Sequence, residues 1–541
     1  MYKRSVILFG ILMLFFCAAF FSLDYISNKE KLNDAALSQQ SYKLKITDVR
    51  GTIYDCRNIP FVNSQKKLIA AVIPCIESLT ALTPAVQESQ KADLYKKCSK
   101  STPFIIEVSQ KVDSPYVKIF EIPVRYAGVT LASHIIGYLS GEKQGVSGIE
   151  KIYNDYLSGD NHEIFVKYNI DAAGKILPGK KELTEDKSYL KSKGVVLNID
   201  SRIQALTEEV ANKYISRGAV MVVEVPNCEI RACASFPGFL PNNVQESLSD
   251  KNSPLLNRIM CSFNLGSIFK LVTSSAALEK GISENTLYNC QGINEVEDTS
   301  FKCFNGKKHE LVNMEQALAH SCNGYFIELI KKMPQDALLN MAKKFRLGSG
   351  NTLAPDMVSS NGVLPSADNL KNIKTLANFS FGQGKLMATP IQVAGIINTI
   401  ASGGIYSNPK LVKGLVDESM RFLKKDKNTV KDEKERIISE NTAAKLKSHM
   451  KASIDYGTSQ RGKPEKMEAA SKTSTAQTGI IEDGKKIEQS WFAGFFPYDR
   501  PKYSVVILSE AGLGGGESCG PVFKEIADRI KTEIPELFIN D

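Results

Sequence analysis

The sequence has 541 residues, of which 43% are hydrophobic and 23% are charged, and its formal net charge is +9. The length predicts two or three domains, and the composition is typical of a globular protein, which excludes a disordered chain. Because this charge is modest for the length, we expect no nucleic-acid partner. It is compatible with work near an anionic surface such as a membrane or a cell wall.

The N-terminal segment Ser5–Leu23 carries no charge. At about 1.5 Å per residue, such a helix would span roughly 28 Å, which matches the hydrocarbon core of one bilayer. Lys3 and Arg4 precede it, so the N-terminus should stay in the cytoplasm. A cleaved signal peptide is the alternative, but its apolar core is usually shorter and ends at a small-x-small site. We therefore predict a single-pass anchor at residues 1–23 and an extracytoplasmic location for the rest of the chain.

Residues 24–185 are expected to form a juxtamembrane linker followed by a mixed N-terminal domain. Gly51 and the polar residues around Pro60 predict two short strands and a turn. The stretch 145–159 predicts a glycine-rich loop and an amphipathic helix. A charged break at 182–193, poor in large apolar residues, separates this part from the next domain.

The domain at 190–541 has a more regular pattern of elements. Strands at both ends, with helices dominating 266–400 between them, predict one sheet built from segments distant in the sequence. The expected elements are a strand at 194–200, a helix at 201–215 with Ser201 as its N-cap, a hairpin turning at Pro226-Asn227, strands at 490–498 and 503–511, and a helix at 521–534. Residues 421–436, mostly charged, predict a solvated surface insert.

Ser267 and Lys270 form an S-x-x-K pair at the start of an apolar run that predicts a buried helix. Residues three apart lie on one helix face, so the hydroxyl can meet the amine. Burial favours the neutral form of a lysine, which can then act as a base toward a serine nucleophile. Two other pairs also fit S-x-x-K, but they lie in exposed, charged stretches: Ser64/Lys67 and Ser188/Lys191.

Two further motifs support this pair. Ser321-x-Asn323 follows a predicted helix, and Lys472-Thr473-Ser474 precedes a predicted strand. Each pattern alone is weak, since S-x-N also occurs elsewhere in the chain. S-x-x-K, S-x-N and K-T-G in this order are the motifs of penicillin-binding proteins and class A β-lactamases.

On these residues the chain resembles the class B penicillin-binding proteins, which are membrane-anchored peptidoglycan D,D-transpeptidases. Further similar stretches are RGTIYD at 50–55, GVSGIEKIYNDYLSG at 145–159, NSPLLNR at 252–258, FGQGKLMATPIQ at 381–392 and WFAGFFP at 491–497. The resemblance implies an α+β fold of the penicillin-binding/serine β-lactamase type at 190–541, with an antiparallel sheet flanked by helices and an all-helical part. An elongated, mixed pedestal domain of the dimerisation type at 24–185 would precede it. No glycosyltransferase domain precedes the break, which favours class B over class A.

The resemblance implies a role for each motif residue. Ser267 would be the acylated nucleophile, Lys270 would take its proton, and Ser321 would relay a proton toward the leaving D-alanine. The remaining roles would belong to four residues: Asn323 holding the substrate amide, Lys472 keeping Lys270 neutral and attracting the substrate carboxylate, and Thr473 and Ser474 touching that carboxylate. The backbone N–H groups of Ser267 and Thr475 would form the oxyanion hole.

Two residues depart from the family pattern. Leu265-Gly266 stands where Pro-Gly is usual, and Ser474 stands where K-T-G has its glycine. Glycine at that place lets a substrate backbone approach closely. We therefore expect the Ser474 side chain to crowd the substrate edge of the strand, and to affect substrate fit and β-lactam affinity more than the acylation chemistry.

Cys290, Cys303 and His309 stand between the first two motifs, with Asp298 on an acidic stretch between the cysteines. Three interpretations stay open here. The cysteines could form a disulfide worth roughly 3 kcal/mol, remain free thiols, or join His309 and Asp298 in a structural zinc site. Catalysis itself is expected to require no cofactor.

The function implied by the resemblance is cross-linking of peptidoglycan stem peptides through a serine acyl-enzyme, in elongation, division or sporulation. β-Lactams would acylate the same serine, and a membrane glycosyltransferase would be the partner. The alternatives are a β-lactam sensor, which the single anchor disfavours, and a catalytically weak scaffold of a cell-wall synthesis complex.

Overall fold

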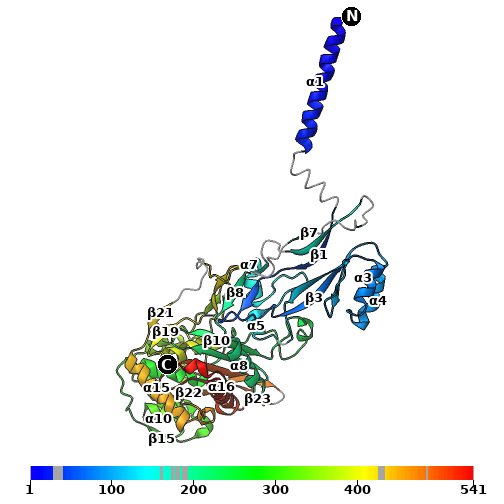
Figure 1. Cartoon of the computed structure of the whole chain (residues 1–541). Helices are drawn as coiled ribbons and strands as arrows, with labels where there is room; N and C mark the ends of the chain where they lie inside the picture. The colour runs from blue at the N-terminus through cyan, green and yellow to red at the C-terminus, as the bar shows by residue number, and fades with distance from the viewer. Residues whose placement is uncertain are drawn as a thin grey trace. The chain divides into compact units, whose positions relative to one another are not determined.

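The computed structural model describes residues 2–27, 41–128, 130–158, 163–171, 176, 183–185, 193–423, 433–482 and 485–539 (Figure 1). These residues divide into two compact units. Unit 1 comprises Met1–Arg50, Asn63–Arg125 and Ser158–Ser192, and unit 2 comprises Gly51–Val62, Tyr126–Leu157 and Lys193–Asp541. This division differs from the continuous boundary expected near residues 185–190, because two early segments pack within unit 2.

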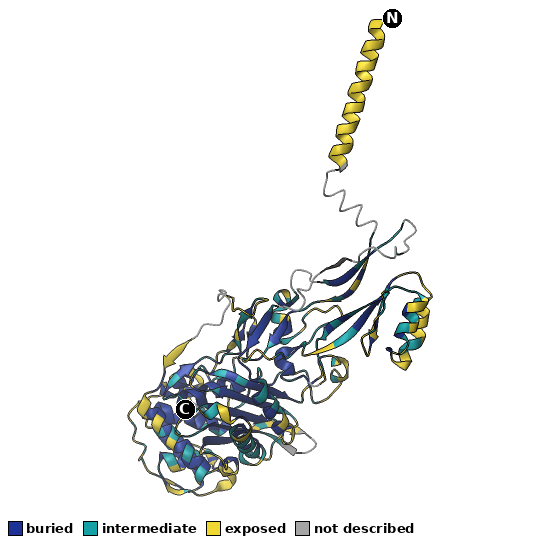
Figure 2. Cartoon of the chain, viewed as in Figure 1, coloured by how far each residue is buried: buried dark blue, intermediate teal, exposed yellow. Residues whose placement is uncertain are grey.

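Unit 1 begins with helix α1 (Tyr2–Ser27), whose described side chains are exposed along its whole length (Figure 2). An 18-residue window of this helix has a mean hydropathy of 2.7, so by length and composition the helix can cross a membrane. The described residues of this unit also form two three-stranded sheets and two further α-helices: β1 (Ser41–Asp48), β6 (Glu163–Asn169) and β7 (Leu183–Glu185); β4 (Phe104–Val108), β3 (Gln65–Val72) and β5 (Val117–Val124); α3 (Ile76–Leu82) and α4 (Lys91–Cys98).

The second half of strand β3 is buried on both faces, which explains its apolar run. Ile69 and Ala71 contribute to one hydrophobic cluster of unit 1, and Ala70 and Val72 contribute to another. Because successive side chains of a strand point to opposite faces, these four residues bind two layers together.

Unit 2 is built on a five-stranded antiparallel sheet in the order β10-β9-β24-β23-β22. Its strands come from distant parts of the sequence, as expected: β9 (Gly218–Glu224), β10 (Glu229–Phe236), β22 (Ala470–Glu482), β23 (Lys485–Phe496) and β24 (Tyr503–Ser509). The expected hairpin turn at Pro226-Asn227 lies between β9 and β10.

Alternate residues of this sheet enter two cores. Met221, Trp491 and Val506 belong to the larger core, whereas Val222 and Phe492 belong to the smaller one. Helices α8 (Ser201–Asn212) and α16 (Gly520–Glu533) cover the smaller core. The larger core lies under the helical part, which comprises α9 (Lys270–Glu279), α10 (Met314–Ala319), α11 (Asn323–Ile330), α12 (Ala337–Lys344), α13 (Ile373–Ser380), α14 (Pro390–Ala401) and α15 (Glu440–Asp455).

Short elements complete unit 2. Strand β8 (Gly194–Leu197) pairs in parallel with β2 (Thr52–Tyr54) and antiparallel with β20 (Val412–Val416). The region expected to be dominated by helices also holds small strand pairs: β11 (Phe263–Asn264) with β18 (Met387–Ala388), β12 (Tyr288–Cys290) with β15 (Glu310–Val312), β13 (Ile293–Val296) with β14 (Thr299–Lys302), and β16 (Thr352–Ala354) with β17 (Met357–Val358). The other α-helices and strands among the described residues of this part are α5 (Ser133–Ile136), α6 (Gly148–Ile152), α7 (Asn154–Ser158), and β19 (Ile405–Ser407) paired with β21 (Lys434–Arg436).

Two local expectations need comment. The N-cap of α8 is Asp200, whose carboxylate accepts from the Arg202 N–H, and not Ser201, whose hydroxyl instead donates to the buried Asp55. An aspartate makes this cap at least as well as a serine. Within the expected surface insert, Lys434–Arg436 are exposed, and 424–432 fall outside the described residues.

Candidate active site

Ser267 lies on a tight turn that leads directly into a buried helix. The short 3₁₀ helix η4 (Gly266–Phe269) carries Ser267 and runs into α9, whose first residue is Lys270. Ser267 is half-buried, whereas Lys270 has no exposed surface. The apolar residues around the pair therefore produce the desolvated lysine that the sequence predicted.

The amine of Lys270 is bound by the second motif. Its Nζ lies 2.7 Å from the Ser321 carbonyl oxygen, 2.7 Å from the Asn323 Oδ1 and 3.1 Å from the Ser321 hydroxyl. It makes no hydrogen bond to Ser267 within the described structure. A neutral amine has two N–H groups and one lone pair. The two N–H groups can donate to the Ser321 carbonyl oxygen and the Asn323 Oδ1, and the lone pair can then accept from the Ser321 hydroxyl.

Ser321 lies between two lysines. Its hydroxyl is also 3.3 Å from the Lys472 Nζ, and Lys472 donates to the Thr473 carbonyl oxygen at 2.8 Å. Ser321 has a φ of +57°, a left-handed backbone conformation that is unusual for a residue with a side chain. This conformation occurs where the chain passes from α10 to α11, and it is strained in the way typical of functional sites.

Burial changes the ionisation of both lysines. It lowers the pKa of the Lys270 amine to about 8, although the neighbouring Cys322 and Cys303 act in the opposite direction. Burial, together with the charge of Lys270, also lowers the pKa of Lys472 well below its usual value. Burial and the repulsion between like charges disfavour a state in which both amines are protonated, so the pair favours a state with one neutral amine that can act as the base.

The third motif lies on β22, which is one of the two edge strands of the five-stranded sheet. Lys472 is completely buried, and the Thr473 hydroxyl lies 2.7 Å from that of Thr458. Thr475 is half-buried, and its hydroxyl accepts from the Gly515 N–H at 3.2 Å. The structure thus brings all three motifs together around the turn of Ser267.

The expectation that Ser474 crowds the substrate edge of β22 is wrong. Ser474 is 2% exposed, and its hydroxyl donates to the Leu265 carbonyl oxygen at 2.8 Å. The side chain therefore fills space inside the protein, against the backbone that precedes Ser267. A contact with a substrate carboxylate does not fit this orientation.

The competing S-x-x-K pairs do not form such a site. Lys67 forms an ion pair with Glu107 in unit 1, and both side chains are more than 40% exposed. The Ser188/Lys191 pair lies outside the described residues. Only the pair at Ser267 lies beside a second and a third motif in the described part of the chain.

A compact cluster of sulfur and nitrogen atoms lies directly behind the second motif. The ligand atoms of Cys290, Cys303, His309 and Cys322 all lie within 4.8 Å of one another. The Sγ atoms of Cys290 and Cys303 are 3.7 Å apart, far longer than a disulfide bond, and those of Cys303 and Cys322 are 3.9 Å apart. The Cys290 Sγ lies 3.4 Å from the His309 Nδ1.

Two corrections to the sequence interpretation follow. Asp298 does not reach this cluster, because it lies at the turn between β13 and β14, 81% exposed, and forms an ion pair with Lys374. Cys322 takes the fourth place, and it was missed because it is the variable residue of the S-x-N motif. The thiol of Cys322 and, to a smaller extent, the imidazole of His309 hold the pKa of Cys303 well below its usual value, which favours its thiolate.

Several known proteins are similar to this chain. Residues 218–528 match the penicillin binding protein transpeptidase domain. The chain is 27% identical to stage V sporulation protein D of Bacillus subtilis, over 98% of this chain and 85% of that protein. It is 26% identical to peptidoglycan D,D-transpeptidase FtsI of Escherichia coli K12, over 88% of this chain and 78% of that protein.

A solved structure supports the fold. The structure described as structural coordination of polymerization and crosslinking by a peptidoglycan synthase complex has a TM-score of 0.70 and 20% identity. The match covers 96% of this chain and 97% of that one. The expected α+β transpeptidase fold is confirmed, and the chain belongs to the penicillin-binding protein transpeptidase family, as a class B member.

Proposed function

We propose that this protein is a peptidoglycan D,D-transpeptidase that works through an acyl-enzyme on Ser267. In the first step the Ser267 Oγ bonds to the penultimate D-alanine carbonyl of a stem peptide, and the peptide bond to the terminal D-alanine breaks. The hydroxyl proton passes through Lys270 to the leaving amine. In the second step the amine of another stem peptide attacks the ester, which forms the cross-link and restores the Ser267 hydroxyl.

The observation that carries this proposal is the Ser321 hydroxyl between the Lys270 and Lys472 amines, at 3.1 and 3.3 Å. This arrangement gives a continuous route for a proton from the base beside Ser267 to a group that can reach a leaving amine. Asn323 also has a defined place, because its amide donates to the Lys302 carbonyl oxygen at 2.9 Å while it accepts from Lys270.

The edge strand supports a peptide as substrate. Among the described residues, strand β22 has one strand neighbour in its sheet, β23, so no strand is paired with its other edge. An extended peptide can bind such an edge as an additional strand. The stem peptide would then lie alongside Thr473 and Thr475, with its scissile carbonyl directed to Ser267 and to the backbone N–H groups of Ser267 and Thr475.

Labelling with a fluorescent penicillin tests the proposal. In this reaction the Ser267 Oγ bonds to the β-lactam carbonyl, the ring C–N bond breaks, and the ring nitrogen takes the proton. We expect intact mass to increase by one adduct, on the peptide that contains Ser267, and no adduct in Ser267→Ala. Ser64→Ala, from the competing motif in unit 1, is the matched control and should label like the parent protein. A parent protein that forms no adduct, or a Ser267→Ala protein that still does, would contradict the proposal.

The location and partner follow from the same function. We infer that α1 is a retained single-pass anchor, since an enzyme that cross-links the wall acts beside the membrane. A membrane glycosyltransferase is the partner that this chemistry needs, because it supplies the glycan strands that are cross-linked. Detection of the N-terminal peptide 5–23 by mass spectrometry in washed membranes would support retention, and its absence from the mature protein would refute it.

We also propose that Cys290, Cys303, His309 and Cys322 hold a structural zinc ion. For Zn–S bonds of about 2.3 Å and Zn–N bonds of about 2.0 Å, a tetrahedral site needs S···S distances of about 3.8 Å and S···N distances of about 3.5 Å. The distances of 3.7, 3.9 and 3.4 Å fit these values. The ion would hold Cys322, and hence Ser321 and Asn323 on either side of it, without touching the substrate.

Metal analysis of protein purified without added zinc, combined with thiol counting under denaturing conditions, tests the ion. We expect about one equivalent of zinc and no missing thiols, and we expect Cys290→Ser to lose the metal. Cys228→Ser removes a buried thiol outside the cluster and is the control. Less than about a tenth of an equivalent of zinc would reject the site, and two missing thiols in the same sample would establish a disulfide instead.

A further inference from the structure

The hydroxyl of Ser474 joins the third motif to the turn that carries the nucleophile. It donates to the Leu265 carbonyl oxygen at 2.8 Å, and both residues are buried. Ser471, on the same strand, is also fully buried, but its hydroxyl has no hydrogen-bond partner in the described structure. Burial on β22 alone therefore does not give a serine a hydrogen bond, so the bond of Ser474 is a specific contact, and Ser471 is a comparison residue without one.

The backbone at this contact is tightly confined. Gly266 has a φ of +58°, and a Cβ placed on it would lie 2.3 Å from the Ser474 Oγ. On its other side, the Gly266 N–H donates to the Gly382 carbonyl oxygen at 3.0 Å. A Cβ on Gly382 would lie 1.9 Å from the Gly266 oxygen. The turn is thus held between Ser474 and Gly382, with no room for a side chain on either glycine.

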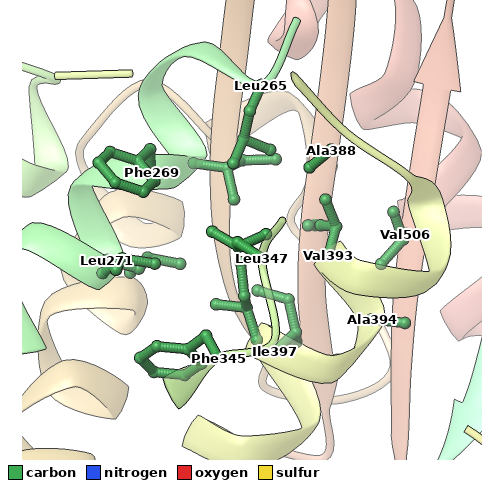
Figure 3. Packing of buried hydrophobic residues seen from close by; sticks show 14 of the residues in the cluster. Leu265, Phe269, Leu271, Phe345, Leu347, Ala388, Val393, Ala394, Ile397 and Val506 are labelled. Atoms are coloured by element: carbon green, nitrogen blue, oxygen red, sulfur yellow. The ribbon is translucent and has the colours of Figure 1, made fainter. Parts of the chain in front are cut away.

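The residues beside this turn are fixed in the core. Figure 3 shows the side chains of Leu265 and Phe269 among the buried residues that include Leu347 and Val393. The indole N–H of Trp491, on the neighbouring strand β23, donates to the Asn264 carbonyl oxygen at 2.8 Å. Because the Leu265 side chain is anchored, its carbonyl oxygen is a fixed point to which Ser474 can attach β22.

We propose that Ser474 is a positioning residue that sets the width of the oxyanion hole. The inference rests on the proposed function, which assigns the two oxyanion donors to the N–H groups of Ser267 and Thr475. Leu265 precedes Ser267 by two residues, and Ser474 immediately precedes Thr475. The bond between Ser474 and Leu265 therefore directly ties together the two segments that carry the donors.

The spacing of these donors matters in one step of the reaction. When the Ser267 Oγ adds to the β-lactam or peptide carbonyl, negative charge develops on the carbonyl oxygen. Stabilisation requires both N–H groups within about 2.7–3.1 Å of that oxygen, and removal of one donor in other enzymes costs about 10²–10³-fold in rate. Loss of the Ser474 hydrogen bond would displace one oxyanion-hole N–H group without removing it, so the expected loss of acylation rate is smaller than this.

The two departures from the family pattern, at Ser474 and Leu265, meet in the structure. Both differ from the usual family residues, and their side-chain hydroxyl and backbone carbonyl are the two ends of one hydrogen bond. Ser474 is useful to this chain for a contact inside the protein, and a glycine in its place would leave the Leu265 carbonyl oxygen without this donor.

The experiment measures penicillin acylation in Ser474→Ala and Ser474→Gly, with Ser471→Ala as the matched control. Stopped-flow traces over a range of penicillin concentrations give the acylation rate k2 and the dissociation constant Kd separately. We expect both Ser474 variants to lower k2 about five- to tenfold, the effect of one net hydrogen bond, with Kd unchanged. The pH midpoint of acylation should also stay unchanged, because Lys270 is not altered. Ser471→Ala should match the parent protein.

The outcomes separate the inference from the proposed function. A parent protein that forms no adduct refutes the proposed function. If the parent protein labels on Ser267 while Ser474→Gly acylates as fast or faster, the proposed function stands and the positioning role is refuted. Equal k2 values for Ser474→Ala and Ser471→Ala refute the role in the same way. Should Ser474→Ala fail to fold, judged by tryptophan emission, Ser474→Gly decides the question.

Discussion

The buried amine of Lys270 makes the acylation rate depend on pH in a predictable way. Its pKa is lowered to about 8, chiefly by burial. Only the neutral amine can take the Ser267 proton, so a lowered pKa moves the active form into the neutral range. The perturbation is a change of pH from 6 to 10, applied to the unaltered protein.

The magnitude follows from the fraction of neutral amine. With a pKa of about 8, that fraction is about 1% at pH 6, about half at pH 8 and about 90% at pH 9. The acylation constant k2/Kd should therefore rise about 50-fold between pH 6 and pH 8, and less than about twofold above pH 8. An exposed lysine with a pKa near 10.4 would be only about 0.4% neutral at pH 8, and the rate would keep rising, about tenfold from pH 8 to pH 9 and about sevenfold from pH 9 to pH 10.

The assay is stopped-flow acylation with benzylpenicillin, which stays an anion over this range. The constant k2/Kd reports ionisations of the free protein, which is the state that the structure describes. Tryptophan emission at each pH is the control for folding. A profile that rises with unit slope through pH 9 without levelling would refute the buried neutral base, and a flat profile would refute Lys270 as the group that titrates.

Three further outcomes are expected. Gly266→Ala places a Cβ at 2.3 Å from the Ser474 Oγ and forces a positive φ on alanine. It should lower the free energy of unfolding by about 1–3 kcal/mol in urea titrations and abolish acylation, and a stable, active variant would contradict the tight turn. Glu510→Gln leaves Arg258, which is 2% exposed, without its carboxylate, so the free energy of unfolding should fall by about 2–4 kcal/mol. Glu525→Gln, which removes the carboxylate from the more exposed pair with Lys213, should lower it by less than about 1 kcal/mol, and equal losses would argue against a buried ion pair at Arg258. The single tryptophan, Trp491, has no exposed surface, so its fluorescence emission should shift to longer wavelength when the protein unfolds. Emission of the native protein at the wavelength of an exposed indole would contradict this burial.

The meeting of the three motifs could be predicted from the sequence because each motif depends on local context. Ser267 and Lys270 start an apolar helix, Ser321 and Asn323 follow one, and Lys472 precedes a strand. The types of these residues and their order in the chain were therefore enough to predict that the three motifs form one site. What the sequence could not give is the direction of the Ser474 side chain, since strand alternation allows it to face either the substrate edge or the core until β22 is placed against the turn of Leu265.

The cysteine cluster illustrates a second limit. Cys290 and Cys303 have a spacing that suggests a loop site, but Cys322 belongs to it only because the chain turns at Ser321, where φ is +57°. Asp298 was favoured by its closeness in sequence, whereas the hairpin of β13 and β14 carries it outward to Lys374. Ligands supplied by a turn between helices cannot be read from spacing alone.

The division into units was likewise beyond the sequence pattern. Short segments such as Gly51–Val62 contain too few residues to indicate which core they join. Their membership depends on a parallel pairing between β2 and β8, which are separated by a long stretch of chain. Non-local pairings of this kind leave no periodic signal.

That pairing affects how the protein is made. Strand β2 ends at Tyr54 and its partner β8 begins at Gly194, so at about 5–20 residues per second the ribosome delivers the partner on the order of ten seconds later. During this delay the apolar residues Ile53 and Val62 have no core to enter, because the core they join is encoded downstream. The early segments therefore stay outside their core until the downstream chain has been made, and a gene fragment that begins at Lys193 would lack the contribution of Ile53 and Val62 to that core.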